Sequence, residues 1–507
     1  MNKSNERKMG VVLSYVAIII NIVIQLLYTP LLIRKLGQSE YGLYSLVASI
    51  IGYLTVMDFG FGNAIVVYTA KYRAQKKYDE EKKLHGMFYV IFILIGIVAT
   101  VLGIILYLLV PNIFGNTMNS MEISKMKVMM LILTFNLAIT FPFSIYSSII
   151  NAYEKFTFQK IIGIISSVLK PILMIPLLFF GYKSITMCII ITLTNIIVMF
   201  SNYLYCKNKL NVKIKFVGFD KVIFKTIFGY SIWIFLGAIV DKINWSVDQF
   251  VLGAVAGTVA VSIYSVASQL NTLFINLSTA VSGVFLPKMS KMVANNASED
   301  ELTDEMIKVG RIQFYIIALM VTGFILIGKN FIIAWAGKEY ELAYTVALIL
   351  IVPICFPLIQ NLGLSIMQAM NKFKFKSIST FIMAIFNVII SIFLAKLYGP
   401  VGSAIGTAIA LIICNIIIIN IYYKKSIGID VVKFWKSIFR ILIPLIIPLT
   451  ITIIFMKFTN LGGIKSIFIY GLLYTILYSI TIYFLCFNNY EKNIVSKLLK
   501  KLHLIRR

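Results

Sequence analysis

Acidic residues, histidines and paired cysteines are scarce in this sequence. Its 507 residues include 20 aspartates and glutamates and two histidines. The cysteines stand singly, without CxxC spacing, at Cys188, Cys206, Cys355, Cys414 and Cys486. Such a sparse set of ligands gives no sign of a disulfide framework, a metal site or a bound cofactor.

Long polar stretches are also missing. Hydrophobic residues make up 60% of the chain and the mean hydropathy is +0.91, whereas soluble proteins are about 45–50% apolar. The amino-terminal MNKSNERKMG leads directly into an apolar run, so no cleaved signal peptide is expected. One membrane span needs about 20 apolar residues, and breaks at charged or turn-rich positions leave about fourteen such segments. They lie near 10–33, 41–70, 87–110, 126–150, 160–181, 184–206, 223–253, 258–287, 311–334, 343–369, 377–397, 401–423, 439–456 and 464–486.

The basic residues are distributed unevenly between the two sides of the membrane. The net charge is +27, which could suggest a nucleic-acid partner. With the amino terminus inside, however, inner segments contain 35 of the 47 lysines and arginines, outer segments contain 10, and Lys170 and Lys242 fall within spans. This is the positive-inside pattern. It predicts cytoplasmic amino and carboxyl termini and excludes nucleic acid as the reason for the charge.

The sequence contains an internal repeat. LGQSEYGLYSLVAS (36–49) matches AGTVAVSIYSVASQ (256–269), aligning Gly37 with Gly257 and Tyr44 with Tyr264. Likewise, IINAYEKFTFQK (149–160) matches IMQAMNKFKFKS (366–377) in nearly the same register.

The repeat predicts an all-α polytopic membrane protein of two lobes. An N-lobe (1–217) and a C-lobe (218–430) would each contain six spans, and residues 431–507 would add two spans and a basic amphipathic tail. Because six is even, both lobes enter the membrane in the same direction, related by a pseudo-two-fold axis along the membrane normal. In transporters built this way the substrate path lies between the lobes, which rock to give alternating access.

The run LGQSEYGLYSLVASIIGYLTVMDFGFGNAIVVYTAKY (36–72) resembles the signature of bacterial polysaccharide flippases of the O-antigen and capsule type. These belong to the multidrug/oligosaccharidyl-lipid/polysaccharide (MOP) exporter superfamily. The shared elements are Leu36-Gly37, Glu40-Tyr41-Gly42, Asp58-Phe59-Gly60 and the basic exit at Lys71. The arrangement of six, six and two spans is similar as well, so the resemblance covers nearly the whole chain.

The resemblance implies a function and a set of partners. It implies a flippase of the bacterial cytoplasmic membrane that moves undecaprenyl-pyrophosphate-linked repeat units to the outer leaflet, coupled to H⁺ or Na⁺. The last two spans would form a groove for the lipid tail, and a polysaccharide polymerase and other assembly proteins would be partners.

Lys170 is the first candidate for the site. It lies near the middle of its predicted span, so its ammonium cannot easily reach either interface. We expect it to line the central cavity and meet an anionic head-group. The alternative is a buried ion pair with an aspartate inside a span. Its partner in the repeat is Asn387, which is also polar.

A polar face on the seventh span supplies further candidates. Asp241, Asn244 and Asp248 recur at helical spacing there, together with Trp245 and Gln249. Asp241 is a candidate for the cavity or for ion coupling, or else a structural partner of Lys242 or Lys170. Asp248 is a gate or coupling candidate, or an ordinary residue at the outer interface. Lys242, on a different face, is a third gate or coupling candidate.

The first span carries the corresponding polar stripe, formed by Asn21, Gln25 and Tyr28. Asn21 aligns with Asp241 in the repeat, and we expect both stripes to face the cleft between the lobes.

Two other charged residues are candidates at or near span ends. Asp58, followed by the flexible FGFGN, is a gate or coupling candidate at a hinge in the second span, or else has a structural capping or pairing role. Arg311 would either hold a phosphate at the cytoplasmic mouth or anchor its helix at the interface. Residues 298–311 open with a Ser298/Glu301 capping box. Residues 489–507 are predicted to form a basic amphipathic helix on the inner leaflet.

Three other functions remain to be weighed. A lipid II flippase would use the same mechanism. Flippases of that kind typically carry several arginines in the first spans, which disfavours this function here. A multidrug or cation antiporter would suit acidic cavity residues, but not Lys170 or the two additional spans. A glycosyltransferase or ligase is disfavoured because the outer loops are short and both histidines, His85 and His503, are predicted to be cytoplasmic. The protein is therefore not expected to be an enzyme.

Overall fold

The computed structural model describes residues 3–216, 218–282, 286–459 and 461–501. These residues form helices joined by short connections, with no strand among them. They separate into two compact units, one comprising 1–265 with 387–403 and the other 266–386 with 404–507. The predicted lobe boundary at 217 is a different division, based on the repeat, and remains a prediction.

Twelve helices are long and apolar enough to span a membrane, among the residues that the structure describes. Two of these stretches each join two of the expected segments across a sharp bend, at Gly257 (φ 78°, ψ −177°) and at Gly399 (φ 57°, ψ −134°). Only glycine adopts such backbone angles readily. Counting the two sides of each bend separately gives the fourteen expected segments, so the all-α polytopic architecture is confirmed.

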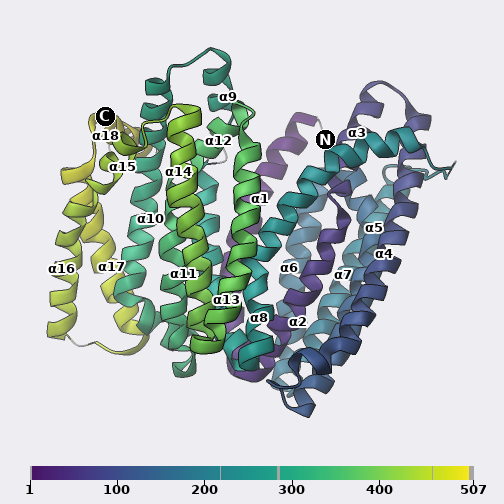
Figure 1. Cartoon of the computed structure of the whole chain (residues 1–507), viewed down its shortest axis with the longest axis horizontal. Helices are drawn as coiled ribbons and strands as arrows, with labels where there is room; N and C mark the ends of the chain where they lie inside the picture. The colour runs from purple at the N-terminus through teal and green to yellow at the C-terminus, as the bar shows by residue number, and fades with distance from the viewer. Residues whose placement is uncertain (1–2, 217, 283–285, 460, 502–507) are drawn as a thin grey trace. The chain divides into compact units, whose positions relative to one another are not determined.

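The first unit contains the first seven long helices. In Figure 1, α4, α5 and α7 run side by side, and α1 packs along α6. Their bounds are α1 (Lys3–Leu36), α2 (Gln38–Leu54), η1 (Thr55–Asp58), α3 (Phe61–Ala74), α4 (Tyr78–Phe114), α5 (Ser120–Ala152), α6 (Phe156–Phe179), α7 (Ser184–Asn208) and the part of α8 (Lys221–Ser282) that ends at Ser265.

The corners of this unit follow the repeat. Gly37 (φ 81°, ψ 168°) separates α1 from α2, and Gly257 bends α8 with nearly the same angles. The alignment of these two glycines in the sequence is therefore matched by their backbone conformation.

The second unit is built around α10. This helix packs against α11 and α17, and α16 packs against α17. The bounds are α9 (Leu286–Ala294), α10 (Glu299–Trp335), η2 (Lys338–Tyr340), α11 (Leu342–Ile359), α12 (Asn361–Ala369), α13 (Phe373–Leu411) outside 387–403, η3 (Ile412–Ile418), α14 (Ile419–Tyr422), η4 (Tyr423–Ile427), α15 (Val431–Phe439), α16 (Leu442–Thr459), α17 (Gly463–Thr481), η5 (Ile482–Cys486) and α18 (Asn489–Lys501).

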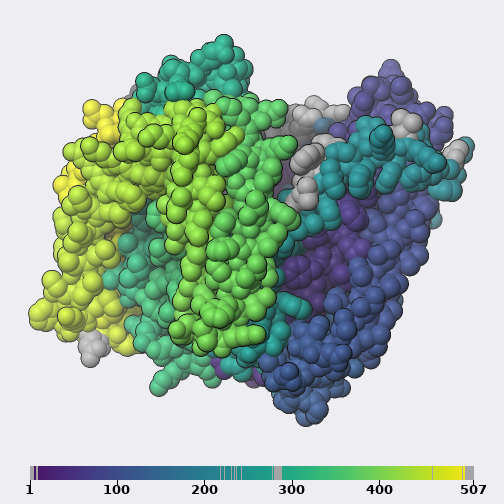
Figure 2. Space-filling model, viewed as in Figure 1, coloured from purple at the N-terminus to yellow at the C-terminus, as the bar shows by residue number. Residues whose placement is uncertain are grey.

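Apolar side chains cover the outside of both units, as a lipid environment requires. The carboxyl-terminal helices, yellow-green and yellow in Figure 2, expose side chains such as Ile443, Phe458 and Phe468.

The predicted capping box is confirmed at the start of α10, where Ser298 and Glu301 exchange hydrogen bonds with each other's backbone.

Two predicted spans are interrupted. Phe59 (φ 51°) and Gly60 (φ 72°) adopt left-handed angles between η1 and α3, within the predicted span 41–70. The predicted span 343–369 is likewise divided at Gln360, between α11 and α12. The break at Phe59–Gly60 lies where a hinge was predicted, and the sequence analysis did not identify the break at Gln360.

Candidate functional site

Lys170 and Gln25 lie at the same level of two parallel helices. Near the start of α6, a Cβ on Gly10 would lie 2.8 Å from the Phe156 Cβ. At its far end, the Lys35 ammonium lies 4.3 Å from the centroid of the Phe179 ring. These contacts relate each position of α1 to one about 145 residues later on α6, because both helices rise equally per residue. Gln25 is therefore at about the same height along this helix pair as Lys170.

The Lys170 side chain is half-buried in the middle of α6. No carboxylate among the described side chains lies within ion-pair distance of it. The alternative of a buried ion pair is thus not seen among those side chains, although the Asp241 side chain lies outside the described residues. A cation inside a membrane helix is costly and, where it is kept, usually marks a functional position.

Asp248 is fully enclosed by the protein. Its carboxylate accepts a hydrogen bond from the Tyr264 hydroxyl at 2.6 Å and another from the Ser403 hydroxyl at 2.7 Å. Asp248 is therefore not exposed to lipid or water, and its role as a gate or coupling residue remains a prediction. Its hydroxyl donors come from beyond the bend in α8 and from beyond the bend in α13, and neither could be identified from the local sequence.

The Asp248 cluster extends to Asn387. The Ser391 hydroxyl donates to the Asn387 side-chain oxygen at 2.9 Å and approaches the Ser403 carbonyl at 3.3 Å. The structure thus connects two sequence candidates, Asp248 and Asn387, through two serines. We call Asp248, Tyr264, Asn387, Ser391 and Ser403 the Asp248 cluster. It offers a carboxylate, an amide oxygen, hydroxyls and a backbone carbonyl in a buried setting.

The other candidates of the first and seventh spans are more dispersed. Asn21 is exposed on α1, and Asn244 is half-buried on α8. The Lys242 ammonium lies beside α2, 3.4 Å from the position that a Cβ on Gly52 would occupy. Among the described side chains, no carboxylate pairs with Lys242. Asp241 lies on α8, but its side chain is outside the described residues.

Asp58 lies at the break in the second span. One of its carboxylate oxygens is 3.5 Å from the position that a Cβ on Gly62 would occupy, in the first turn of α3. A negative charge is favoured there because the helix dipole is positive at its amino end. The residue therefore has a local structural partner in α3, and a hinge at Phe59–Gly60 remains a prediction.

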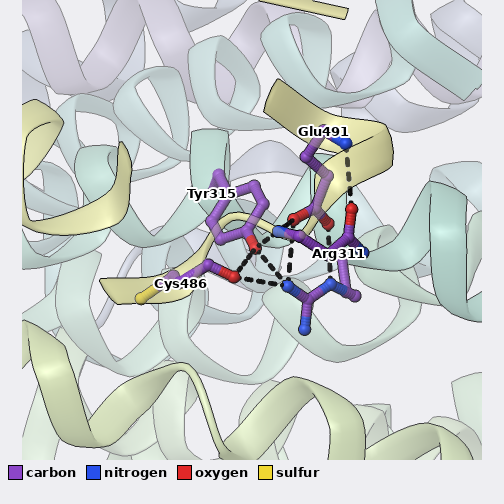
Figure 3. A network of polar contacts seen from close by, with 5 residues as sticks. Arg311, Tyr315, Cys486 and Glu491 are labelled. Carbon is purple, nitrogen blue, oxygen red and sulfur yellow. Dashed lines mark hydrogen bonds and ion pairs between the residues drawn. The ribbon is translucent and has the colours of Figure 1, made fainter. Parts of the chain in front are cut away.

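Arg311 is engaged by the carboxyl-terminal helix (Figure 3). Its guanidinium donates to both Glu491 oxygens, at 2.7 and 3.0 Å, and to the Cys486 carbonyl at 2.8 Å. Tyr315 donates to the same carboxylate at 3.1 Å. These groups occupy much of the guanidinium, which favours the interpretation of Arg311 as an anchor over that of a phosphate ligand.

The sequence analysis missed a cluster at the predicted outer side of the first unit. Ser39 and Thr258 both donate to Glu122, at 2.5 and 2.8 Å. A Cβ on Gly42 would lie only 1.8 Å from the Thr258 carbonyl oxygen, so glycine is needed for the bend of α8 to approach α2. The internal repeat is the sequence feature that could have indicated this cluster, because it pairs residues 36–49 with 256–269 and aligns Gly42 with Ser262.

A second missed cluster lies at the predicted cytoplasmic end. The Glu81 carboxylate accepts from the Tyr153 hydroxyl at 2.7 Å and from Arg73 at 3.3 Å, while the Arg73 guanidinium lies 3.5 Å from the centroid of the Tyr153 ring. Burial, and then the Glu81 carboxylate, raise the pKa of the Tyr153 phenol above its ordinary value. The phenol therefore remains a hydrogen-bond donor, and the cluster joins α3, α4 and the end of α5.

Comparison with known sequences identifies the family. The model of the family described as polysaccharide biosynthesis protein matches residues 8–293, more than half of the chain. The chain belongs to this family. A putative O-antigen transporter of Shigella flexneri is 22% identical to it over 407 residues, which cover 78% of this chain and 92% of that protein.

Solved structures show the same fold. The lipid II flippase MurJ in an inward closed conformation matches with a TM-score of 0.72 and 19% identity, over 93% of this chain and 97% of that one. An inward-facing multidrug resistance transporter of the MATE family, itself a member of the MOP superfamily, matches with a TM-score of 0.62 and 14% identity, over 80% and 99% of the two chains. These likenesses show that the chain has the fold of these two transporters, and the predicted polysaccharide-export family agrees with the family match.

Proposed function

We propose that this protein moves undecaprenyl-pyrophosphate-linked oligosaccharides from the cytoplasmic to the outer leaflet of the bacterial cell membrane. The observation that carries the proposal is Lys170, a half-buried cation in the middle of α6 without an ion-pair partner among the described side chains. An ammonium is a point charge that suits a phosphate group. Gln25, at the same level of α1, can add hydrogen bonds to the phosphate or the first sugar. The family membership and the similarity to a putative O-antigen transporter support this substrate class.

A flipping assay tests this function. Purified protein is reconstituted into liposomes with a fluorescent polyprenyl-diphosphate oligosaccharide, and the fraction reaching the opposite leaflet is followed by quenching. We expect the initial rate to fall at least about tenfold in Lys170→Gln, equivalent to about 1.4 kcal/mol of lost interaction. Lys183→Gln, which removes a charge from the loop after α6, is the matched control. Equal rates for the wild type and both variants would exclude Lys170 from substrate binding, and no flipping by any of them would reject the function.

A lipid II flippase is the second candidate, because MurJ shares the fold over most of both chains. The same liposomes loaded with fluorescent lipid II separate the two functions. A higher rate with lipid II than with the polysaccharide precursor would favour the second candidate.

We further propose that the Asp248 cluster binds the coupling cation, H⁺ or Na⁺. A buried carboxylate can take up a proton, and the oxygen atoms of Asn387, Ser391 and Ser403 are the type of ligand that a small hard cation prefers. In both cases the cation would compensate a negative charge inside the membrane.

Imposed gradients test the coupling. Flipping by the wild type should accelerate when a Na⁺ or a pH gradient is applied, and Asp248→Asn should abolish this acceleration while leaving a residual basal rate. Ser262→Ala, which alters a hydroxyl bonded only within its own helix among the described residues, should retain the acceleration. If Asp248→Asn responds to both gradients like the wild type, the coupling site lies elsewhere.

A further inference from the structure

A cavity lies where α4 and α8 begin, at the predicted cytoplasmic side of the first unit. Its volume is about 440 Å³, within the range of pockets that bind small molecules. No step of the proposed flipping cycle uses it. The residues that line it are Lys83, Leu84 and Met87 of α4 and Gly218, Phe219, Asp220, Lys221 and Ile223 around the start of α8.

The cavity is apolar on its floor and basic at its rim. Leu84 and Met87 are buried, whereas Lys83 and Lys221 are exposed. The acidic member, Asp220, caps α8 by accepting a hydrogen bond from the Ile223 amide at 3.0 Å. One oxygen of that carboxylate is thus committed to the helix, and two lysines to one aspartate leave the rim positive.

A row of phenylalanines leads away from the cavity along α8. The Phe219 and Phe224 ring centroids are 5.0 Å apart, and those of Phe224 and Phe228 are 5.8 Å apart. Phe61 of α3 supports the row, with its centroid 6.2 Å from that of Phe224. Phe219 is 52% exposed and Phe228 is 39% exposed, so the row presents an apolar surface continuous with the cavity.

Lys83 and Lys221 also lie at positions along their helices that suit contact with lipid phosphates. Both lie in the first two turns, and the strongly apolar part of α4 follows Lys83. Lysines at this boundary lie at the level of lipid phosphates, and each basic residue near an anionic surface strengthens binding. The exposed phenylalanines then lie at the level where hydrocarbon chains begin.

We propose that this cavity binds the phosphate of an anionic lipid between Lys83 and Lys221, with the hydrocarbon chain lying along Phe219, Phe224 and Phe228. The shared chemistry is a phosphate ester on a long apolar chain. It can come from a resident anionic phospholipid of the inner leaflet or from the polyprenyl-diphosphate carrier before it enters the transport path.

Binding to the purified full-length protein tests the site without requiring transport. Delipidated protein in a neutral detergent is titrated with phosphatidylglycerol, with polyprenyl diphosphate, with phosphatidylcholine and with inorganic phosphate, and the shift of the thermal unfolding midpoint is followed. The two anionic lipids should bind the wild type. The double variant Lys83→Gln/Lys221→Gln should weaken that binding about tenfold to thirtyfold, as expected for two lysines close to a phosphate.

The matched control is Lys82→Gln/Lys225→Gln. It removes the same charge from the same two helices at positions that do not line the cavity, and it should bind the lipids like the wild type. The tighter of the two anionic lipids identifies the source. Equal affinity of the two double variants would overturn the proposal, as would a phosphatidylcholine or inorganic phosphate affinity equal to that of the anionic lipids.

Discussion

The two halves of the repeat use equivalent helices but place different charges on them. In the first half, α1 and α6 bring Gln25 to the level of Lys170, whose charge has no ion-pair partner among the described side chains. In the second half the repeat aligns Asn387 with Lys170, and Asn387 is joined through two serines to Asp248. The backbone bends at Gly37 and Gly257 are nearly the same. The fold has therefore been kept while the chemistry of the two halves diverged.

The charges of the two halves differ in sign, and they also differ in whether they have hydrogen-bond or ion-pair partners. Removing one partner of a buried, hydrogen-bonded charge lowers stability because the other partner is left unsatisfied, whereas removing an unpaired buried charge raises it. We therefore expect the charges of the second half, and those of the carboxyl-terminal segment, to be stabilising, and Lys170 to be maintained at the expense of stability. Free energies of unfolding, measured by titration with sodium dodecyl sulfate in mixed micelles, test this contrast.

The largest effect is expected at the Arg311–Glu491 pair, whose side chains are only 14% and 4% exposed. Glu491→Ala leaves the buried guanidinium without its counter-charge and should lower the free energy of unfolding by roughly 3–5 kcal/mol. Arg73→Gln is the comparison in the first half. Its loss should be nearer about 1 kcal/mol, because Arg73 is 37% exposed and Tyr153 still donates to Glu81. Equal losses at the two places would show that burial does not govern these pairs.

The next effect is expected at Asp248. Asp248→Leu removes the acceptor of the Tyr264 and Ser403 hydroxyls and should lower the free energy of unfolding by about 3 kcal/mol. Asp248→Asn keeps a side-chain oxygen and should lose about half as much. A Leu variant as stable as the wild type would mean that the cluster contributes nothing to folding.

These residues also show what could be predicted from sequence. The periodic apolar segments and the Ser298/Glu301 box are local patterns, and the spans and the cap follow from them. The repeat aligned Gly37 with Gly257, but the bends at these glycines were not predicted. The partners of Asp248 and Arg311 could not be predicted. Ser403 lies 155 positions after Asp248, and Glu491 lies 180 positions after Arg311, so only the packed fold brings them together.

A smaller effect is expected at the corner where the two halves of the repeat meet within the first unit. Gly42→Ala places a methyl group against the Thr258 carbonyl and Ser262. Because the nearest neighbour is backbone, the two helices themselves must move apart, so we expect a loss of at least about 2 kcal/mol in the free energy of unfolding. Ser262→Ala, at the repeat-equivalent position, removes only a bond to the Val259 carbonyl of its own helix and should change stability by less than about 0.5 kcal/mol. Similar losses for both variants would show that the crossing has no preference for glycine on the α2 side.

The smallest change in stability, and the most informative sign, is expected at Lys170. Lys170→Met keeps the length of the side chain but removes its charge, so the free energy of unfolding should stay the same or rise by up to about 1 kcal/mol. The repeat-equivalent Asn387→Leu should instead lower it by about 1 kcal/mol, because Asn387 is buried and its oxygen accepts from Ser391. Changes of opposite sign in the free energy of unfolding at these equivalent positions would mean that Lys170 is retained for substrate binding and Asn387 for the stability of the fold. A clear loss of stability in Lys170→Met would instead reveal a structural partner for this lysine and remove the main support for its role in substrate binding.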